Sequence, residues 1–481
     1  MKLRRTAWKI GAAAAIAAGL ALAGGWVWRV GELRRTVAAA LPAVPDLAGG
    51  SAELKSRLAD AERRARSGWR PVEALRELAR LYHANGFYAE AMQAYAKLLA
   101  VDAADPRWPH LQAGLLSGYG RLDEALPLLR RAMTLAPDYL PAHVRLGDAL
   151  LKTNRPAEAA QIYRAVLARS PDNLYAQLGL ARLDMDAERW DAARDRLQRL
   201  VTAHPGFGSA WFLLATVDEN RGDQAQAKAD RERVGLNGRF REMPDPWTDE
   251  LMEDCYDVYR LRVVAGAAAS AGETDTARRW LERALVLAPA DATAERQLGN
   301  LLAKADQLAE ARRHLERAAA LAPADADNWN YLVALLNTLG DDRAAEQALA
   351  TGLANCPESP GLHFERGRRL AVAGRVGEAV VELQTARRLR PEAANAYVEL
   401  AMLNFRRGLV DEGVAEMRGA LAVEPGQPLA LVALARYEID QGDAAAALDL
   451  IRRARQQPKV KSGDVSALER AYQEKFGRLP W

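Results

Sequence analysis

One arrangement of apolar and polar positions recurs along the chain, and residues 141–171 show it well. Apolar residues recur there at the spacing of one helix face, a break follows at Asn154, and a second helical run ends at Pro171. Proline closes the second run because it cannot continue the hydrogen-bond ladder of a helix. The pattern predicts a helix, a turn, a second helix and another turn. The apolar positions are Leu146, Gly147, Leu150, Leu151, Ala159, Ile162, Tyr163 and Val166.

Small residues mark this unit twice, each time with a period of 34 residues. Such residues let paired helices approach closely, and a period of this length is typical of a solenoid of stacked units. The first series is Ala79, Ala113, Gly147, Ala181, Ala215, Ala265, Gly299, the exception Val333, Gly367, Ala401 and Ala435. The second is Ala91, Ala125, Ala159, Ala193, Ala227, Ala277, Ala311, Ala345, Ala379, Gly413 and Ala447.

The unit resembles the tetratricopeptide repeat, whose pattern is Leu-Gly, an aromatic residue three positions later, Ala, an aromatic residue and Pro. Leu150 replaces the first aromatic residue, and Trp211 and Trp329 stand at the family's leading tryptophan position. The matching residues are Leu146, Gly147, Ala159, Tyr163 and Pro171 in one unit and Leu298, Gly299, Leu302, Ala311, Leu315 and Pro323 in another. The resemblance covers residues 72–461 and implies an all-α, right-handed superhelical solenoid of about eleven helix-turn-helix repeats.

The repeat series has one interruption, because 50 residues instead of 34 separate Ala215 from Ala265. We therefore expect five units over residues 72–241 and six over residues 258–461. An insertion of 16 residues, 242–257, lies between them.

Solenoid ends need covers, and the sequence offers a helix for each end. Residues 29–71 are expected to form a tether, interrupted by Pro42 and Pro45, and then a capping helix that begins at Ser51. Residues 462–481 are expected to form the carboxy-terminal cap.

Residues 1–28 combine a basic segment with an apolar run. Residues 10–28 carry no charge and approach the roughly 20 residues that span a bilayer's hydrocarbon core. Basic residues before the run favour a cytoplasmic amino terminus, so we expect a single membrane helix with the repeats outside the cytoplasm, which is the periplasm if the source is a Gram-negative bacterium. The alternative is a secretory signal cleaved near Ala23, which also exports the repeats.

Charge and motifs limit the function classes. The 66 basic and 63 acidic residues nearly cancel, so nucleic acid is not an expected partner. Cys255 and Cys356 lie in no CxxC pair, and the six histidines are scattered over different units. There is no nucleophile elbow, P-loop, HExxH motif or dinucleotide fingerprint, and the repeats leave no room for a catalytic domain. We expect no enzyme activity, no cofactor and no metal site.

The resemblance implies that positions two, five, nine and twelve of each first helix line a concave groove that holds extended or helical peptides. These positions give one apolar patch with a cation, formed by Tyr175, Leu178, Arg182, Met185 and Phe212. They give a second patch formed by Val398, Met402 and Phe405. Aromatic residues beside arginine suit a peptide site, and the alternative is that these side chains pack against neighbouring first helices.

A polar set of first-helix residues is similar to the family's clamp for the terminal carboxylate of a peptide. Its members are Arg296, Asn300, Asn330 and Asn337. The pattern is incomplete, because Gly361 and Glu365 stand where the following unit would supply a cation. The alternative is a solvated polar groove.

The insertion at residues 242–257 holds seven acidic residues and no basic one. Pro244 and Pro246 are expected to keep its start extended. Trp247 then either plugs the joint between the two arrays or anchors a docked partner.

These observations predict a non-enzymatic, membrane-tethered scaffold that binds protein or peptide partners outside the cytoplasm. One alternative is an assembly or maturation factor for envelope complexes, of the polysaccharide export or cytochrome assembly type. A remote alternative is an enzyme that uses carboxylates and arginines of the groove. The sequence leaves the oligomeric state open.

Overall fold

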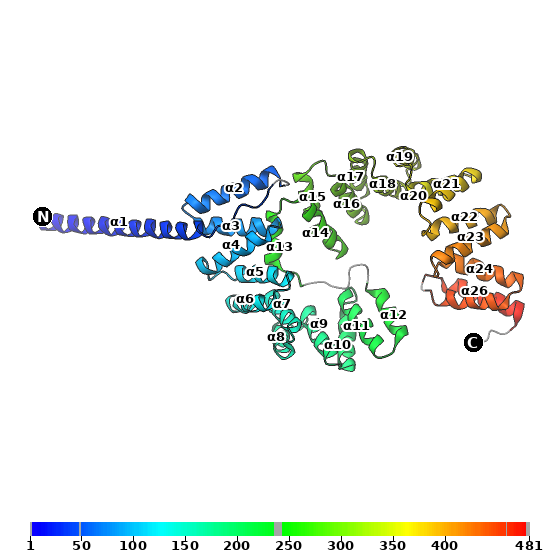
Figure 1. The fold of residues 1–481 in the computed structure, drawn as a ribbon, viewed down its shortest axis with the longest axis horizontal. Coiled ribbons are helices and arrows are strands. Elements are labelled where there is room, and N and C mark those ends of the chain that lie inside the picture. The colour runs from blue at the N-terminus through cyan, green and yellow to red at the C-terminus, as the bar shows by residue number, and fades with distance from the viewer. Residues whose placement is uncertain (1, 48–49, 235–242, 458, 478–481) are drawn as a thin grey trace. The chain divides into compact units, whose positions relative to one another are not determined.

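The computed structural model describes residues 2–47, 50–234, 243–457 and 459–477, with the backbone alone for residues 2–19. Over these residues the chain forms helices α1 to α26 and one short 3-10 helix, η1, and no strand (Figure 1). The all-α prediction is therefore confirmed. Residues 235–242, where the fifth repeat was expected to end and the insertion to begin, lie outside the described part, as do residues 478–481 of the predicted carboxy-terminal cap.

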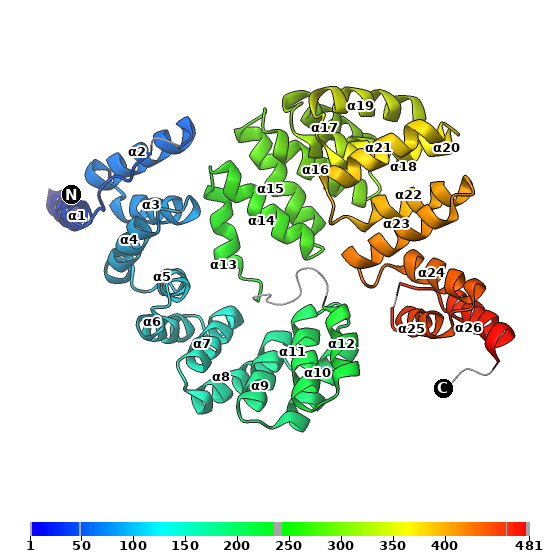
Figure 2. The ribbon, with the colours of Figure 1, turned by 45° about the vertical axis from the view of Figure 1, so that its right-hand side comes forward.

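The chain divides into two compact units, residues 1–289 and residues 290–481. Figure 2 shows the helices of each unit from a second direction. The first unit begins with α1 (Lys2–Ala38) and α2 (Ala52–Ser67). Its helix pairs are α3 (Pro71–Ala84) with α4 (Tyr88–Val101), α5 (Arg107–Gly118) with α6 (Leu122–Leu135), α7 (Leu140–Lys152) with α8 (Pro156–Arg169), α9 (Leu174–Asp186) with α10 (Trp190–Ala203), α11 (Gly208–Asn220) with α12 (Gln224–Arg233), and α14 (Val258–Ser270) with α15 (Thr274–Leu287). Between the last two pairs lie α13 (Pro246–Asp249) and η1 (Glu250–Asp254).

The second unit holds five further helix pairs and a final helix. The pairs are α16 (Ala292–Lys304) with α17 (Leu308–Leu321), α18 (Ala326–Thr338) with α19 (Asp342–Asn355), α20 (Pro360–Val372) with α21 (Val376–Leu389), α22 (Ala394–Arg406) with α23 (Val410–Val423), and α24 (Pro428–Gln441) with α25 (Ala444–Arg455). Helix α26 (Ser462–Phe476) packs on α24 and α25 through Val465, Leu468 and Tyr472. The boundary between the compact units falls one helix pair after the insertion.

The turn inside every helix pair contains one residue with positive φ, and these residues keep the 34-residue register. Glycine takes this left-handed conformation in eight pairs, where the helix terminus disfavours a Cβ. Asn154, Glu188 and Asp306 take it in the other three, with φ of 55°, 56° and 60°. The glycines are Gly86, Gly120, Gly222, Gly272, Gly340, Gly374, Gly408 and Gly442.

The small residues of the second series lie where the two helices of a pair contact each other. Alanines of the second series are at most 1% exposed, as expected where paired helices touch. Gly413 departs from alanine because Phe405 fills the space: a Cβ on Gly413 would lie 2.4 Å from the Phe405 ring.

The amino-terminal helix α1 continues further than the sequence indicated. Residues 29–38, expected to belong to a tether, are helical and pack against α2 and α3. Val30 and Val37, which lie seven residues apart on one helix face, are buried in that contact. Their burial explains why the helix continues to Ala38. Trp26 stacks on Trp69 with ring centroids 5.5 Å apart.

The predicted membrane helix over residues 10–28 lies in part outside the described side chains, which begin at Leu20. Among the described residues, no helix has both the length and the apolar character needed to cross a bilayer.

Candidate functional site

The described part of the insertion, residues 243–257, folds back onto the first helices of the amino-terminal repeats. Helix α13 contacts α5, and η1 contacts α3. Asp245 caps α13 by accepting hydrogen bonds from the backbone N–H and the hydroxyl of Thr248. Pro246 is the first residue of α13, where its missing N–H costs nothing, so the extended start predicted from Pro244 and Pro246 ends at Asp245.

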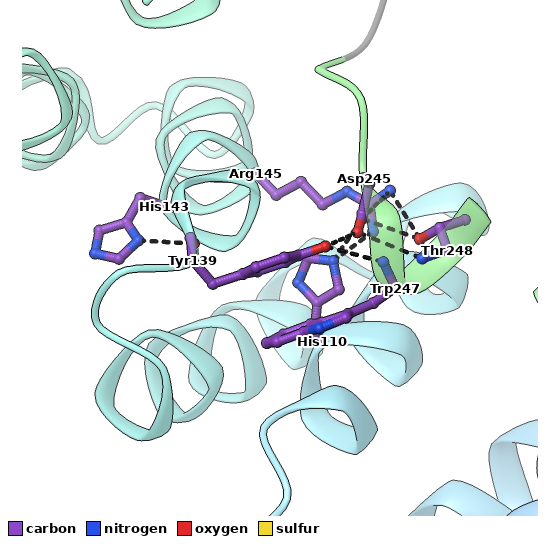
Figure 3. A network of polar contacts seen from close by, with 7 residues as sticks. All are labelled: His110, Tyr139, His143, Arg145, Asp245, Trp247 and Thr248. Carbon is purple, nitrogen blue, oxygen red and sulfur yellow. Dashed lines mark hydrogen bonds and ion pairs between the residues drawn. The ribbon is translucent and has the colours of Figure 1, made fainter. Parts of the chain in front are cut away.

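The carboxylate of Asp245 is 4% exposed and is held by side chains of two repeats (Figure 3). His110 Nε2 on α5 lies 2.6 Å from Asp245 Oδ2, and Arg145 Nη2 on α7 lies 2.9 Å from the same oxygen. The hydroxyl of Tyr139, the N-cap residue of α7, donates to the other oxygen, Oδ1. A buried carboxylate held by a cation and two neutral donors is a charge-assisted recognition geometry.

The pKa values of the three titratable side chains at this site are shifted, and the shifts indicate their protonation states. Burial by itself raises the pKa of Asp245, but the His110 hydrogen bond and the Arg145 charge outweigh it and hold the pKa well below its usual range. Burial lowers the pKa of His110, although the hydrogen bond to Asp245 opposes this. Burial and the bond to Asp245 raise the pKa of Tyr139. The site therefore contains an ionised carboxylate, a neutral imidazole and a neutral phenol.

Trp247 packs against aromatic rings from the same two repeats. Its ring stacks on Tyr139, with centroids 3.5 Å apart and an interplanar angle of 11°. The ring of His110 meets it edge-on at 5.3 Å. The Trp247 backbone N–H also donates to the Tyr139 hydroxyl at 3.1 Å, so one tyrosine contacts both the aromatic residue and the carboxylate of the insertion.

The second half of the insertion is attached to α3. Arg80 Nε donates to the Asp254 carboxylate at 2.7 Å. The amide of Asn85 donates to the Asp254 carbonyl at 2.8 Å and accepts from the Tyr256 N–H at 2.7 Å. Leu251, Cys255 and Tyr256 are buried, so apolar packing supports these polar contacts. Three successive repeats thus bind one continuous segment.

A cavity of about 360 Å³ continues beside the insertion within the first unit. Helices α5 and α7 supply most of its lining, including Gly114, Arg145 and Lys152. Met243 and Thr248 of the insertion line it as well. The insertion therefore leaves part of this surface open.

The first predicted patch lies mainly in the packing of α9 and α11. Leu178 is 2% exposed, which corrects its placement on an open groove, because it packs in the core with Trp211. Tyr175 lies edge-on to Phe207, with ring centroids 5.5 Å apart. Met185 and Phe212 are half-buried beside this core. Arg182 pairs with Asp148 of the preceding repeat at 3.8 Å.

The residues of the second predicted patch are divided between the buried core and the exposed surface. Val398 is 6% exposed and belongs to the core, which corrects its placement on an open groove. Phe405 is half-buried against Gly413, whereas Met402 is 39% exposed. Of these three residues, Met402 is the most open to a partner.

The predicted carboxylate clamp is occupied by side chains of its own unit. Arg296 pairs with Asp327 at 3.2 Å and with Asp325 at 3.8 Å. Asn337 donates to Glu365 at 2.7 Å, and Asn330 lies against Gly361. Asn300 is partly exposed. An arginine paired with two carboxylates does not present a free cation, so these contacts favour the polar groove over the clamp.

Sequence reasoning named Trp247 but missed the residues that receive it. His110 stands at position five of its first helix and Arg80 at position nine, both positions that the family resemblance assigned to the groove. Tyr139 and Arg145 stand outside those positions, and no local pattern marked them. Among the described residues, no group of three or more histidine, cysteine, aspartate or glutamate side chains is placed to hold a metal ion.

Family models of the tetratricopeptide repeat match residues 116–166, 151–217 and 364–428. The chain is 24% identical over 456 residues to cellulose synthase operon protein C of Pseudomonas fluorescens, covering 85% of this chain and 35% of that protein. It is 34% identical over 139 residues to the CTR9 homolog of Arabidopsis thaliana, covering 27% of this chain and 12% of that protein. The chain thus spans far less than two thirds of the length of these relatives.

Solved structures of low similarity include yeast Tom70 and YrrB, a protein with an unusual peptide-binding site. The Tom70 comparison has 15% identity and a TM-score of 0.39, and it covers 84% of this chain and 96% of Tom70. The YrrB comparison has 22% identity and a TM-score of 0.31, and it covers 39% of this chain and 96% of YrrB. The family models confirm tetratricopeptide repeats in this chain over residues 116–217 and 364–428.

Proposed function

We propose that this protein is a non-enzymatic scaffold whose amino-terminal repeats bind a segment of a partner protein on their first-helix face. One observation carries the proposal: this face already holds a segment of the chain itself, residues 243–256, through α3, α5 and α7. The contacts combine a buried carboxylate, a stacked tryptophan and backbone hydrogen bonds, which are the chemistry of peptide recognition.

We further propose that residues 10–28 tether the repeats to a membrane and that the repeats lie outside the cytoplasm. The charge pattern of residues 1–28 supports this, and so do the exposed apolar side chains in the last third of that segment. Leu20, Leu22, Trp26, Val27 and Trp28 are each at least half exposed. Deletion of residues 1–28 should move the protein from the membrane to the soluble fraction, and amino-terminal sequencing of the mature chain separates a retained anchor from cleavage near Ala23.

A second candidate is an assembly factor for a polysaccharide export complex. It is supported by the similarity to cellulose synthase operon protein C, which extends over 85% of this chain. Identification of partners by crosslinking and mass spectrometry distinguishes it from a general scaffold, because an assembly factor should capture subunits of one envelope complex.

Site-specific photocrosslinking tests the scaffold function. Benzoylphenylalanine replaces Phe212, a half-buried residue at position five of the first helix α11, in one variant and Arg164, an exposed residue of α8, in the control. Crosslinked partners at position 212 and none at position 164 support the proposal. Equal capture from both positions, or none from either, contradicts it.

A further inference from the structure

We propose that the Asp245 site is a receptor for an acidic partner segment that carries an aspartate two positions before an aromatic residue, and that residues 243–256 occupy it as an internal competitor. This inference rests on the proposed function and names the class of ligand. Partner binding is then an exchange, in which the partner replaces the insertion on α3, α5 and α7.

The first argument is that the contacts exceed what a structural plug needs. Burying an ionised side chain is unfavourable unless it is paired, and apolar side chains of similar volume often fill a joint at lower cost. The insertion instead places the Asp245 carboxylate against His110, Tyr139 and Arg145. Such an arrangement selects a carboxylate at one position, and selection of this kind is a property of a receptor.

The second argument is that Tyr139 links recognition of the two side chains. Its hydroxyl donates to Asp245 and accepts the Trp247 N–H, while its ring stacks on the Trp247 ring. The aspartate and the tryptophan therefore have to be two residues apart and to enter a helical turn. A ligand with only one of them loses contacts from the same tyrosine.

The third argument is charge complementarity. The described insertion contributes Asp245, Asp249, Glu250, Glu253, Asp254 and Asp257 and no basic residue. Arg80 and Arg145 on the first helices pair with two of these carboxylates. An acidic partner segment fits the same surface for the same reason.

The fourth argument is that the insertion fills the site incompletely. The Nδ1 atom of His110 is buried and has no hydrogen-bond partner among the described residues. The cavity of about 360 Å³ beside Met243 and Thr248 extends the surface along α5 and α7. A longer segment therefore has room that the insertion does not use, in a cavity lined by Arg145 and Lys152 and also by Asp148.

The test is a binding assay with the full chain in detergent. The probe is a fluorescent peptide of 14 residues copied from residues 243–256, with serine in place of Cys255. The chain is compared as the natural protein and as the double variant Asp245→Ala/Trp247→Ala, which weakens the internal competitor. Fluorescence anisotropy gives the dissociation constants, and circular dichroism verifies that each variant is folded.

The double variant should bind the peptide at least about tenfold more tightly than the natural chain, because its site is open for a larger fraction of the time. Adding Arg145→Ala to the double variant should weaken binding at least about tenfold, while adding Arg164→Ala, the charge-matched control, should not. A peptide with alanine in place of Asp245 should lose affinity to a similar extent.

Equal peptide affinity in the natural chain and the double variant would overturn the inference, as would insensitivity to Arg145→Ala. So would dimerisation of the natural chain that depends on concentration and is abolished in the double variant, because the insertion would then serve exchange between two copies. Failure of this assay alongside positive crosslinking at position 212 contradicts the ligand class but not the scaffold function.

Discussion

Replacement of Asp245 by alanine is the most direct perturbation of the docked insertion. The substitution removes a carboxylate that is 4% exposed and leaves His110, Tyr139 and Arg145 without their shared acceptor. It also removes the side-chain cap of α13, which accepts from Thr248. The expected result is undocking of residues 243–256 while the helix pairs stay folded, because each pair is stabilised mainly by its own neighbours.

The magnitude follows from the bonds that are lost. A hydrogen bond to a charged group contributes about 1.5–3 kcal/mol, and contributions within one network are not additive. Arg145 is 24% exposed and regains water once unpaired, so its share is discounted. The two hydrogen bonds from His110 and Tyr139 therefore determine most of the effect. We expect the free energy of docking of the insertion to weaken by about 3 kcal/mol, or roughly 150-fold in the docking equilibrium.

Hydrogen exchange measured by mass spectrometry is the suitable assay. The backbone N–H groups of Trp247 and Tyr256 are bonded to Tyr139 and Asn85, so their exchange reports opening of the insertion. Exchange over residues 243–256 should accelerate in Asp245→Ala by the factor estimated above. Asp245→Asn, which keeps the shape and one acceptor oxygen, should give a smaller acceleration.

Asp249→Asn is the matched control, because it removes the same charge from an exposed residue of the same segment. Desolvation raises the pKa of Asp249, and the carboxylates of Asp245 and Glu273 raise it further, so its ionised form is disfavoured in the fold. Asp249→Asn should therefore leave the exchange unchanged or slow it slightly. Exchange in Asp245→Ala within about threefold of the natural chain would refute the proposed contribution of the carboxylate.

Three other outcomes are expected. Burial first, and then the charges of Arg260 and Arg145, lower the pKa of His83 to about 3. Because the unfolded chain protonates this histidine below about pH 6.5, the free energy of unfolding should fall by about 2 kcal/mol between pH 7 and pH 5. Urea unfolding of His83→Gln should show a correspondingly flatter pH dependence. Gly413→Ala should destabilise the second unit by about 1–3 kcal/mol in thermal unfolding, and the double variant that also carries Phe405→Leu should recover stability. The control is Gly377→Ala in α21, where the added Cβ meets no atom within 4 Å, and it should be neutral or stabilising. Val37→Ala should weaken the packing of α1 on α2 and α3 by about 2 kcal/mol. Hydrogen exchange over residues 30–38 should then be faster, and unchanged exchange there would contradict the packing role of Val37.

The helix pairs could be predicted from the sequence because their causes are local and repeated. Small residues at two positions, a left-handed turn and a closing proline recur with one period, and each recurrence supports the next. Asn154, Glu188 and Asp306 show the limit of this reasoning, since they take the same turn conformation without being glycine. The register predicted their place, but their residue types gave no indication of their φ angles.

The insertion site could be predicted only in part because its contacts join distant segments. His110 and Asp245 are 135 residues apart, and no periodic pattern connects them. Position five of the first helix marked His110 as a groove residue, yet the same rule marked Leu178 and Val398, which are buried. Position alone does not say whether a side chain faces a partner or a neighbouring helix, because this depends on the size of the residues that flank it.

An internal ligand changes the requirement that a partner has to meet. A partner with the same contacts as residues 243–256 competes against a segment that is attached to the site. Its apparent affinity is therefore its intrinsic affinity multiplied by the fraction of time for which the site is open. Weak acidic peptides are then rejected even where their charge suits Arg80 and Arg145. Only a segment that adds contacts, for example in the cavity beside Met243, is favoured over the insertion. The docked insertion thereby lowers the apparent affinity of every ligand for the groove, so that only strong ligands bind at a given concentration. Weakening the insertion through Asp245→Ala should widen the range of peptides that bind.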